Sequence, residues 1–131
     1  MATILLVEND AQNREMLRRW LQRWGYQVLL APDGAQGIEL AATAQPDLIV
    51  MDINMPVLDG LDATTRLKTA PATQAIPILV LTANALAGDR GRALAAGADD
   101  YEPKPVDFAR LRHKIAALLA APSLLPPSAE L

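Results

Sequence analysis

The fold of this chain is decided by one stretch, PDLIVMDINMP, which runs from Pro46 to Pro56. Residues 47–51 are almost wholly apolar and are typical of a β-strand covered on both faces, as strands of a parallel sheet are. Asp52 stands at the end of that run, and the turn-forming Pro56 and Gly60 follow it. Because open α/β sheets place their ligand chemistry at the C-terminal ends of strands, Asp52 is the first candidate for a functional residue. The alternative is that Asp52 merely caps the following helix.

The composition of the chain limits what it can do. With 131 residues, 51% of them hydrophobic and 21% charged, it is long enough for one domain with its own core. The net charge of −3 argues against general binding to nucleic acids or membrane surfaces, because no excess of basic side chains exists to pair with phosphates. Cysteine is absent, which excludes disulfides and thiolate metal sites. We find no targeting leader and no apolar run of membrane-spanning length, so we expect a cytoplasmic protein.

Apolar runs and helical patterns alternate along the rest of the chain. The expected strands are residues 2–7, 26–31, 47–51, 76–81 and 98–101. The expected helices are residues 11–24, the segment between Asp33 and Gln45, residues 61–69 and 85–96, and the segment from a capping Asp107 to Leu119. This alternation predicts an α/β fold, a doubly wound five-stranded parallel sheet in the flavodoxin-like order 2-1-3-4-5 with helices on both faces. The proline-rich residues 121–131 are expected to form a disordered tail, which leaves residues 1–120 as the domain.

In this strand order the first and third strands are neighbours, so several polar side chains are expected to meet at one edge of the sheet. The side chains that follow strand ends are Glu8, Asn9, Asp10, Asp52, Thr82 and Lys104. Clustered carboxylates repel one another unless a cation joins them, and a hard ion such as Mg²⁺ prefers oxygen ligands of this kind. Lysine and threonine are suited to binding a phosphoryl group. The set is most simply interpreted as an aspartate nucleophile that accepts a phosphoryl group with metal assistance.

These motifs give the chain a family resemblance. From Thr3 to Leu119 it resembles a receiver domain of two-component response regulators, similar to the single-domain chemotaxis regulators. The matching motifs are Leu5-Leu6-Val7-Glu8, Pro46-Asp47, Met51-Asp52-Ile53-Asn54-Met55-Pro56, Asp59-Gly60, Leu81-Thr82-Ala83, Ala96-Gly97-Ala98 and Lys104-Pro105. The resemblance is specific because these separate motifs agree in both order and spacing.

The resemblance implies a role for each motif. Asp52 would take phosphate from a phosphohistidine on a histidine kinase or a phosphotransfer protein, forming an aspartyl phosphate in a phosphorelay. Thr82 and Lys104 would bind that phosphate, and Tyr101 would be the aromatic switch that rotates as Thr82 moves. Further implied residues are Asn54 and Asn84, whose side chains would tune dephosphorylation, and Pro105, which would follow a cis peptide bond.

One departure from the family pattern concerns the metal. Mg²⁺, or Mn²⁺, would be held by Glu8, Asp52 and the backbone carbonyl of Asn54, but the second of two usual adjacent acids is here Asn9. An amide oxygen can ligate Mg²⁺ yet contributes no charge, which predicts metal affinity lower by roughly ten- to a hundredfold. Asp10 could compensate if the loop bends inward, although we favour a capping role for it.

Three functional hypotheses follow. The favoured one is a phosphoacceptor switch. Its only enzymatic activity would be its own phosphorylation and dephosphorylation. The second is a pseudo-receiver, an interaction module that no longer depends on phosphate because of Asn9. The third is an aspartyl-phosphate phosphatase, which the absence of a second acid at Asn54 disfavours.

The resemblance also implies partners. A downstream protein would dock on the face formed by the fourth helix, fifth strand and fifth helix, and the chain would act as a monomer or weak dimer, as a stand-alone protein or as a fragment of a hybrid kinase. No direct contact with nucleic acid or membrane is expected. His113, the single histidine, is expected to be a solvated helix residue.

Overall fold

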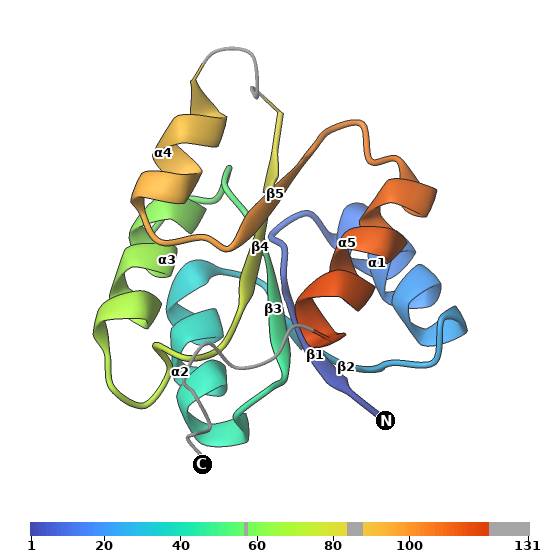
Figure 1. Cartoon of the computed structure of the whole chain (residues 1–131), viewed down its shortest axis with the longest axis horizontal. Coiled ribbons are helices and arrows are strands. Elements are labelled where there is room, and N and C mark those ends of the chain that lie inside the picture. The colour runs from blue at the N-terminus through green and yellow to red at the C-terminus, as the bar shows by residue number, and fades with distance from the viewer. Residues whose placement is uncertain (57, 84–87, 121–131) are drawn as a thin grey trace.

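The computed structural model of the chain describes residues 1–56, 58–83 and 88–120. Its strands are β1 (Thr3–Val7), β2 (Gln27–Ala31), β3 (Leu48–Asp52), β4 (Ile78–Thr82) and β5 (Asp100–Pro103). Its helices are α1 (Ala11–Arg23), α2 (Gly34–Ala44), α3 (Gly60–Thr69), α4 (Asp89–Ala95) and α5 (Phe108–Ala120). The strands form one parallel sheet in the order β2-β1-β3-β4-β5 (Figure 1). The predicted doubly wound fold is therefore confirmed.

The sheet separates two hydrophobic clusters. The helices α1 and α5 cover one face of the sheet, and α2, α3 and α4 cover the other (Figure 1). Successive residues of a strand point to opposite faces, so Leu5 and Val7 pack toward α2 and α3 whereas Ile4 and Leu6 pack toward α1 and α5. Every residue of β3 and β4 is buried. This double burial explains the near-continuous apolar runs in the sequence.

Aspartates start most of the helices. In each case the carboxylate accepts a hydrogen bond from the backbone N–H three residues later, which satisfies a donor that the helix itself leaves unpaired. The pairs are Asp10 with Asn13 (2.8 Å), Asp33 with Gln36 (2.8 Å), Asp59 with Asp62 (2.9 Å) and Asp107 with Arg110 (2.9 Å). The expected caps at Asp33 and Asp107 are thus confirmed.

The strand predicted at residues 98–101 is wrong by two residues, because β5 runs from Asp100 to Pro103. Gly97 has a left-handed φ of +105°, and the Ala98 N–H donates to the carbonyl of Ala93 at 3.0 Å, so Ala98 still closes the end of α4. Pairing with β4 then begins with Leu79 opposite Asp100. The helix predicted at residues 85–96 is described only from Asp89 onward, and the tail predicted at residues 121–131 lies outside the described residues.

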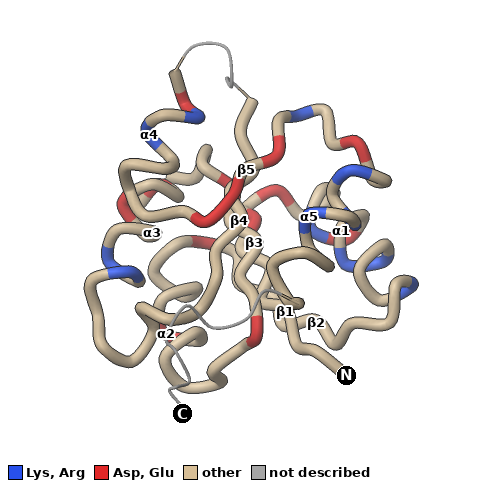
Figure 2. The backbone as a smooth tube through the Cα atoms, viewed as in Figure 1, with Lys and Arg blue, Asp and Glu red and all other residues tan. Residues whose placement is uncertain are grey.

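Charges are unevenly distributed over the two sides of the molecule. Basic positions of α1 and α5 lie together on one side of the fold (Figure 2).

His113 is exposed on α5, as expected. Between α1 and α5, Trp20 stacks on Phe108 with ring centroids 4.6 Å apart. Within the described residues, no helix is both long and apolar enough to cross a membrane.

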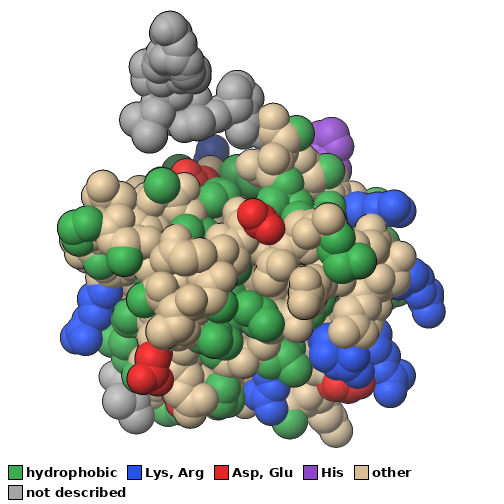
Figure 3. Space-filling model, turned by 90° about the horizontal axis from the view of Figure 1, so that it is seen from below, with side chains coloured by type: hydrophobic (Ala, Val, Ile, Leu, Met, Phe, Trp, Pro, Cys, Tyr) green, Lys and Arg blue, Asp and Glu red, His purple; other side chains and the backbone are tan. Residues whose placement is uncertain are grey.

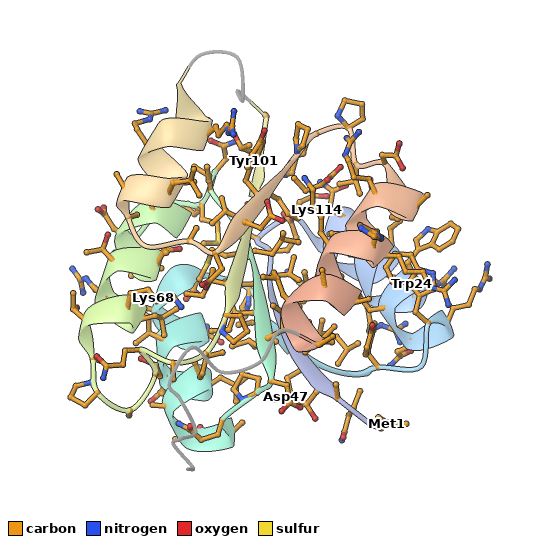
Figure 4. The ribbon with its side chains drawn as sticks, in the orientation of Figure 1. Met1, Trp24, Asp47, Lys68, Tyr101 and Lys114 are labelled. Atoms are coloured by element: carbon orange, nitrogen blue, oxygen red, sulfur yellow. The ribbon has the colours of Figure 1, made fainter. Side chains whose placement is uncertain are left out.

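At the lower end of the sheet, where the strands begin, a side chain binds the backbone of β1. There the Thr3 N–H donates to Asp47 Oδ2 at 2.7 Å, which ties the start of β1 to the residue before β3 (Figure 4). Seen from this end, the visible lysine and arginine side chains lie around the margin (Figure 3). The candidate site lies at the other end of the strands.

Candidate functional site

Three strand ends bring Glu8, Asp52 and Lys104 together. Because Val7 lies opposite Met51 in the parallel pair β1–β3, the next residues, Glu8 and Asp52, stand side by side. Their side chains are buried, with 1% and 3% of their surface exposed, although each carries a carboxylate. Lys104 Nζ lies 3.0 Å from Asp52 Oδ1 and 3.8 Å from Glu8 Oε1. Residues about a hundred positions apart in the chain thus share one small polar site, which we call the rim site.

The rim site carries more negative than positive charge. Burial raises the pKa of Glu8; the N–H of Asp10 opposes this, and the charge of Asp52 adds to it. Among the described residues Glu8 Oε1 has no hydrogen-bond partner, and Glu8 Oε2 accepts from the Asp10 N–H at 3.1 Å. Two buried carboxylates that share one ammonium group leave an unbalanced charge, which favours a further cation.

The donor set fits Mg²⁺, which prefers oxygen ligands and retains several waters. Glu8 and Asp52 supply carboxylate oxygens, one of them without a hydrogen-bond partner among the described residues, and the exposed Asn9 stands beside Glu8 in sequence. The Asp10 carboxylate instead accepts from the Asn13 N–H and caps α1, which is the role we favoured for it. Within residues 1–56, 58–83 and 88–120, no three His, Cys, Asp or Glu side chains gather as a metal-binding group. The site therefore offers two acids rather than three.

The loops around Asp52 fix its orientation. The Asn54 N–H lies 3.4 Å from Asp52 Oδ1, and the Asn54 side chain is exposed. Gly60, the first residue of α3, packs directly on the end of β3: a Cβ placed there would lie 2.1 Å from the backbone oxygen of Asp52. Asn84, expected to tune dephosphorylation, lies outside the described residues.

Thr82 is the last residue of β4 and is fully buried. Its carbonyl accepts from the Lys104 N–H at 2.7 Å, which joins the ends of β4 and β5 at the rim. Its hydroxyl donates to Asp89 Oδ2 of α4 at 2.8 Å. The backbone of Thr82 is therefore at the predicted place, while its side chain contacts a residue that sequence reasoning did not consider.

Tyr101 lies on β5 between two cations. The Arg90 guanidinium of α4 is 5.4 Å from the centre of its ring, and Lys114 Nζ of α5 is 4.8 Å from it (Figure 4). Lys114 also donates to the Tyr101 carbonyl at 2.5 Å. The peptide bond between Lys104 and Pro105 is cis, the isomer expected at that position.

Sequence reasoning missed two further features near the site. Arg14 Nη1 donates to the Glu8 carbonyl at 2.8 Å and so holds the turn after β1; an arginine four residues after a helix cap gives no signal of this in the sequence. Glu102 is fully buried and binds Arg110 (2.8 Å) and Lys114 (3.1 Å), forming what we call the β5 cluster. In the sequence this residue is visible only as a glutamate before Pro103, which does not reveal the pairing.

Comparisons with known proteins agree with this geometry. Residues 4–116 match the family model of the response regulator receiver domain. Response regulator MprA of Mycobacterium leprae is 46% identical over 116 residues, which are 88% of this chain and 50% of that protein. The chain thus spans about half the length of the curated relatives it matches.

Solved structures give the same result. A putative response regulator from Chloroflexus aurantiacus has a TM-score of 0.88 and 32% identity over 92% of this chain and 98% of its own. The receiver domain of sensor histidine kinase PA1611 from Pseudomonas aeruginosa, which has a magnesium ion coordinated in its active-site cleft, has a TM-score of 0.86 and 38% identity, with the same coverage. Chemotaxis protein CheY4 of Vibrio cholerae has a TM-score of 0.84 and 30% identity over 90% of this chain and 98% of its own.

Proposed function

The chain belongs to the response regulator receiver family, and on that premise we propose that Asp52 is its phosphoacceptor. The observation that carries the proposal is the contact of 3.0 Å between Lys104 Nζ and the buried Asp52 carboxylate. A lysine in this position holds the nucleophile in place and neutralises charge on an incoming phosphoryl group.

The transfer is a displacement at phosphorus. A carboxylate oxygen of Asp52 forms the new P–O bond while the P–N bond of a phosphohistidine breaks, and the imidazole leaves with the electron pair of that bond. Lys104 and the Asn54 N–H both contact Asp52 Oδ1, so they set the direction in which the carboxylate faces the donor. Positioning and electrostatic stabilisation supply most of the rate in such transfers.

We propose that Mg²⁺ is bound by Glu8, Asp52, the Asn54 carbonyl and the neutral oxygen of Asn9. The ion would supply positive charge to the oxygens of the transferring group. Support comes from Glu8 Oε1, which has no hydrogen-bond partner among the described residues, and from the magnesium ion in the related PA1611 receiver domain. Asn9 in place of an acid makes this site weaker than one with three carboxylates.

The remaining elements of the proposal concern partners. The phosphoryl donor is a histidine kinase or a histidine phosphotransfer protein, and the cytoplasm is where they meet. A downstream protein binds the face formed by α4, β5 and α5, which contains Tyr101. We propose no enzymatic activity beyond phosphorylation and dephosphorylation of the chain itself. Asn54 and Asn84 are proposed as the residues that tune the rate of dephosphorylation.

Incubation with acetyl phosphate and Mg²⁺ tests the proposal. We expect intact-mass analysis to show one phosphoryl adduct that hydroxylamine removes, as it does from acyl phosphates. Asp52→Ala should abolish the adduct, whereas Asp62→Ala, which removes an exposed acid of α3, should leave it unchanged. Failure of the unsubstituted protein to take up phosphate would favour the pseudo-receiver instead.

A further inference from the structure

The first turn of α4 contains a buried acid, Asp89. Only 2% of this residue is exposed, although it is the first residue of its helix. One carboxylate oxygen, Oδ2, accepts the Thr82 hydroxyl at 2.8 Å, and the other, Oδ1, pairs with Arg92. A carboxylate without water is costly unless such partners hold it, so its position depends on both contacts.

The next residue of the same turn contacts the second residue of the proposed switch. Arg90 lies over the ring of Tyr101, 5.4 Å from its centre. Two consecutive residues of α4 therefore contact the side chains of Thr82 and Tyr101. A change at either contact is transmitted to the same helical turn.

We propose that Asp89 is a positioning residue that holds the Thr82 hydroxyl away from Asp52 and competes for it with the phosphoryl group. This inference rests on the proposed function of Asp52. A threonine hydroxyl has one proton to donate, so Thr82 cannot donate to Asp89 and to a phosphoryl oxygen at the same time. The backbone of Thr82 is fixed at the rim by Lys104, so the exchange requires only rotation of the side chain between staggered rotamers.

The competition couples phosphorylation to α4. When Thr82 turns to the phosphoryl group, Asp89 keeps only Arg92 as a partner among the contacts described above. A buried carboxylate that loses a donor is destabilised, which favours rearrangement of the first turn of α4. Arg90 is in that turn, so its contact with Tyr101 changes together with it. The phosphoryl group thus shifts the helix by taking away a hydrogen bond.

A double-mutant cycle with beryllofluoride, a phosphoryl mimic, tests this competition at a fixed Mg²⁺ concentration by ¹⁹F NMR. Removal of the competitor in Asp89→Ala should tighten beryllofluoride binding about tenfold, the size expected for one charged hydrogen bond. In a Thr82→Val background the same substitution should have no effect, because no hydroxyl remains to be competed for. Asp89→Asn retains an acceptor oxygen and should give a smaller change than Asp89→Ala.

Equal effects of Asp89→Ala in both backgrounds would show that Asp89 acts by supporting α4 rather than through Thr82, and would overturn the inference. Unchanged or weaker beryllofluoride binding by Asp89→Ala would overturn it as well. The proposed function is tested separately, because it requires the unsubstituted protein to bind beryllofluoride and Asp52→Ala not to bind it. A third measurement needs no phosphoryl mimic: the χ1 rotamer populations of Thr82, from side-chain coupling constants, should differ between the unsubstituted protein and Asp89→Ala. Identical populations in both would contradict the inference.

Discussion

Glu8 in the rim site, directly after β1, and Glu102 in the β5 cluster are both buried glutamates, with 1% and 0% of their surfaces exposed, yet their pKa values shift in opposite directions. Burial raises the pKa of Glu8, and one backbone N–H and the more distant Lys104 do not offset it. Burial also acts to raise the pKa of Glu102, but hydrogen bonds from Arg110, from Lys114 and from the Asp107 N–H outweigh it, so the pKa is lowered.

The two glutamates differ in the number of cationic side chains that pair with each of them. Glu102 receives two cationic side chains from α5, Arg110 in the first turn and Lys114 four residues later, and its charge is satisfied within the protein. Glu8 shares Lys104 with Asp52, and one of its oxygens has no hydrogen-bond partner among the described residues. A carboxylate that is already paired stabilises the fold, whereas one that is incompletely paired is available to a ligand.

The largest effect should come from removing the shared cation. Lys104→Met leaves two buried carboxylates together, and we expect it to lower the free energy of unfolding at neutral pH by about 3 kcal/mol. Lys114→Met, the matched change in the β5 cluster, should cost less because Arg110 still pairs with Glu102. Urea unfolding monitored by circular dichroism measures both. Equal losses for the two variants would contradict the proposed difference in charge balance.

A smaller loss should follow Glu102→Gln, about 2 kcal/mol at neutral pH, because the amide weakens charged hydrogen bonds to Arg110 and Lys114. Since the pKa of Glu102 is lowered in the folded state, its contribution is fully present above the ordinary value of 4.5 and is lost as the pH falls through the lower folded value. Unfolding curves of both proteins over a pH series should therefore converge in acid. A difference that does not depend on pH would show that the charge of Glu102 is not its source.

The Mg²⁺ affinity of the rim site should increase when an acid is added beside it. Asn9→Asp should increase Mg²⁺ affinity about tenfold, equivalent to about 1.4 kcal/mol, because a third anion is placed beside the ion. Gln74→Glu adds the same charge at an exposed position beyond the end of α3 and serves as the control. Isothermal titration calorimetry measures the two affinities. Unchanged affinity in Asn9→Asp would refute the view that Asn9 weakens the metal site.

The smallest effect should be a gain in stability. Glu8→Gln removes a buried charge next to Asp52, so we expect the free energy of unfolding to rise by about 1 kcal/mol in the presence of EDTA. The same substitution at Glu102 is expected to do the opposite, which makes the pair a direct test of the comparison. Thermal unfolding with and without Mg²⁺ would measure it, and Mg²⁺ should stabilise the Glu8→Gln variant less than the unsubstituted protein. A destabilised Glu8→Gln variant in EDTA would show that Glu8 is already satisfied.

Much of this arrangement could be predicted from the sequence. Buried strands give long apolar runs, and the alternation of these runs with helical patterns predicted the strand order. That order in turn predicted that Glu8, Asp52 and Lys104 meet at one edge of the sheet. Contacts that depend on helix placement could not be predicted. Asp89 follows a glycine with φ of +96° and resembles an ordinary first-turn acid, and its burial against Thr82 depends on how α4 packs.

Short elements limited the prediction in the same way. The strand β5 has four residues, too few for an alternation pattern to fix its boundaries, and its position follows from pairing with β4. Glu102 lies in a polar run and resembles a solvated side chain until α5 brings Arg110 and Lys114 over it. Pairings of this kind depend on three-dimensional register rather than on local composition.

Gly60 places a constraint on Asp52 that its own chemistry does not reveal. A methyl group at position 60 would overlap the backbone oxygen of Asp52, so even alanine would have to push β3 and α3 apart. Function could then be lost by a change that removes no charge, donor or acceptor. Surveys of natural variation that weigh only reactive side chains would pass over this residue, and attempts to design new specificities onto the scaffold must leave it untouched.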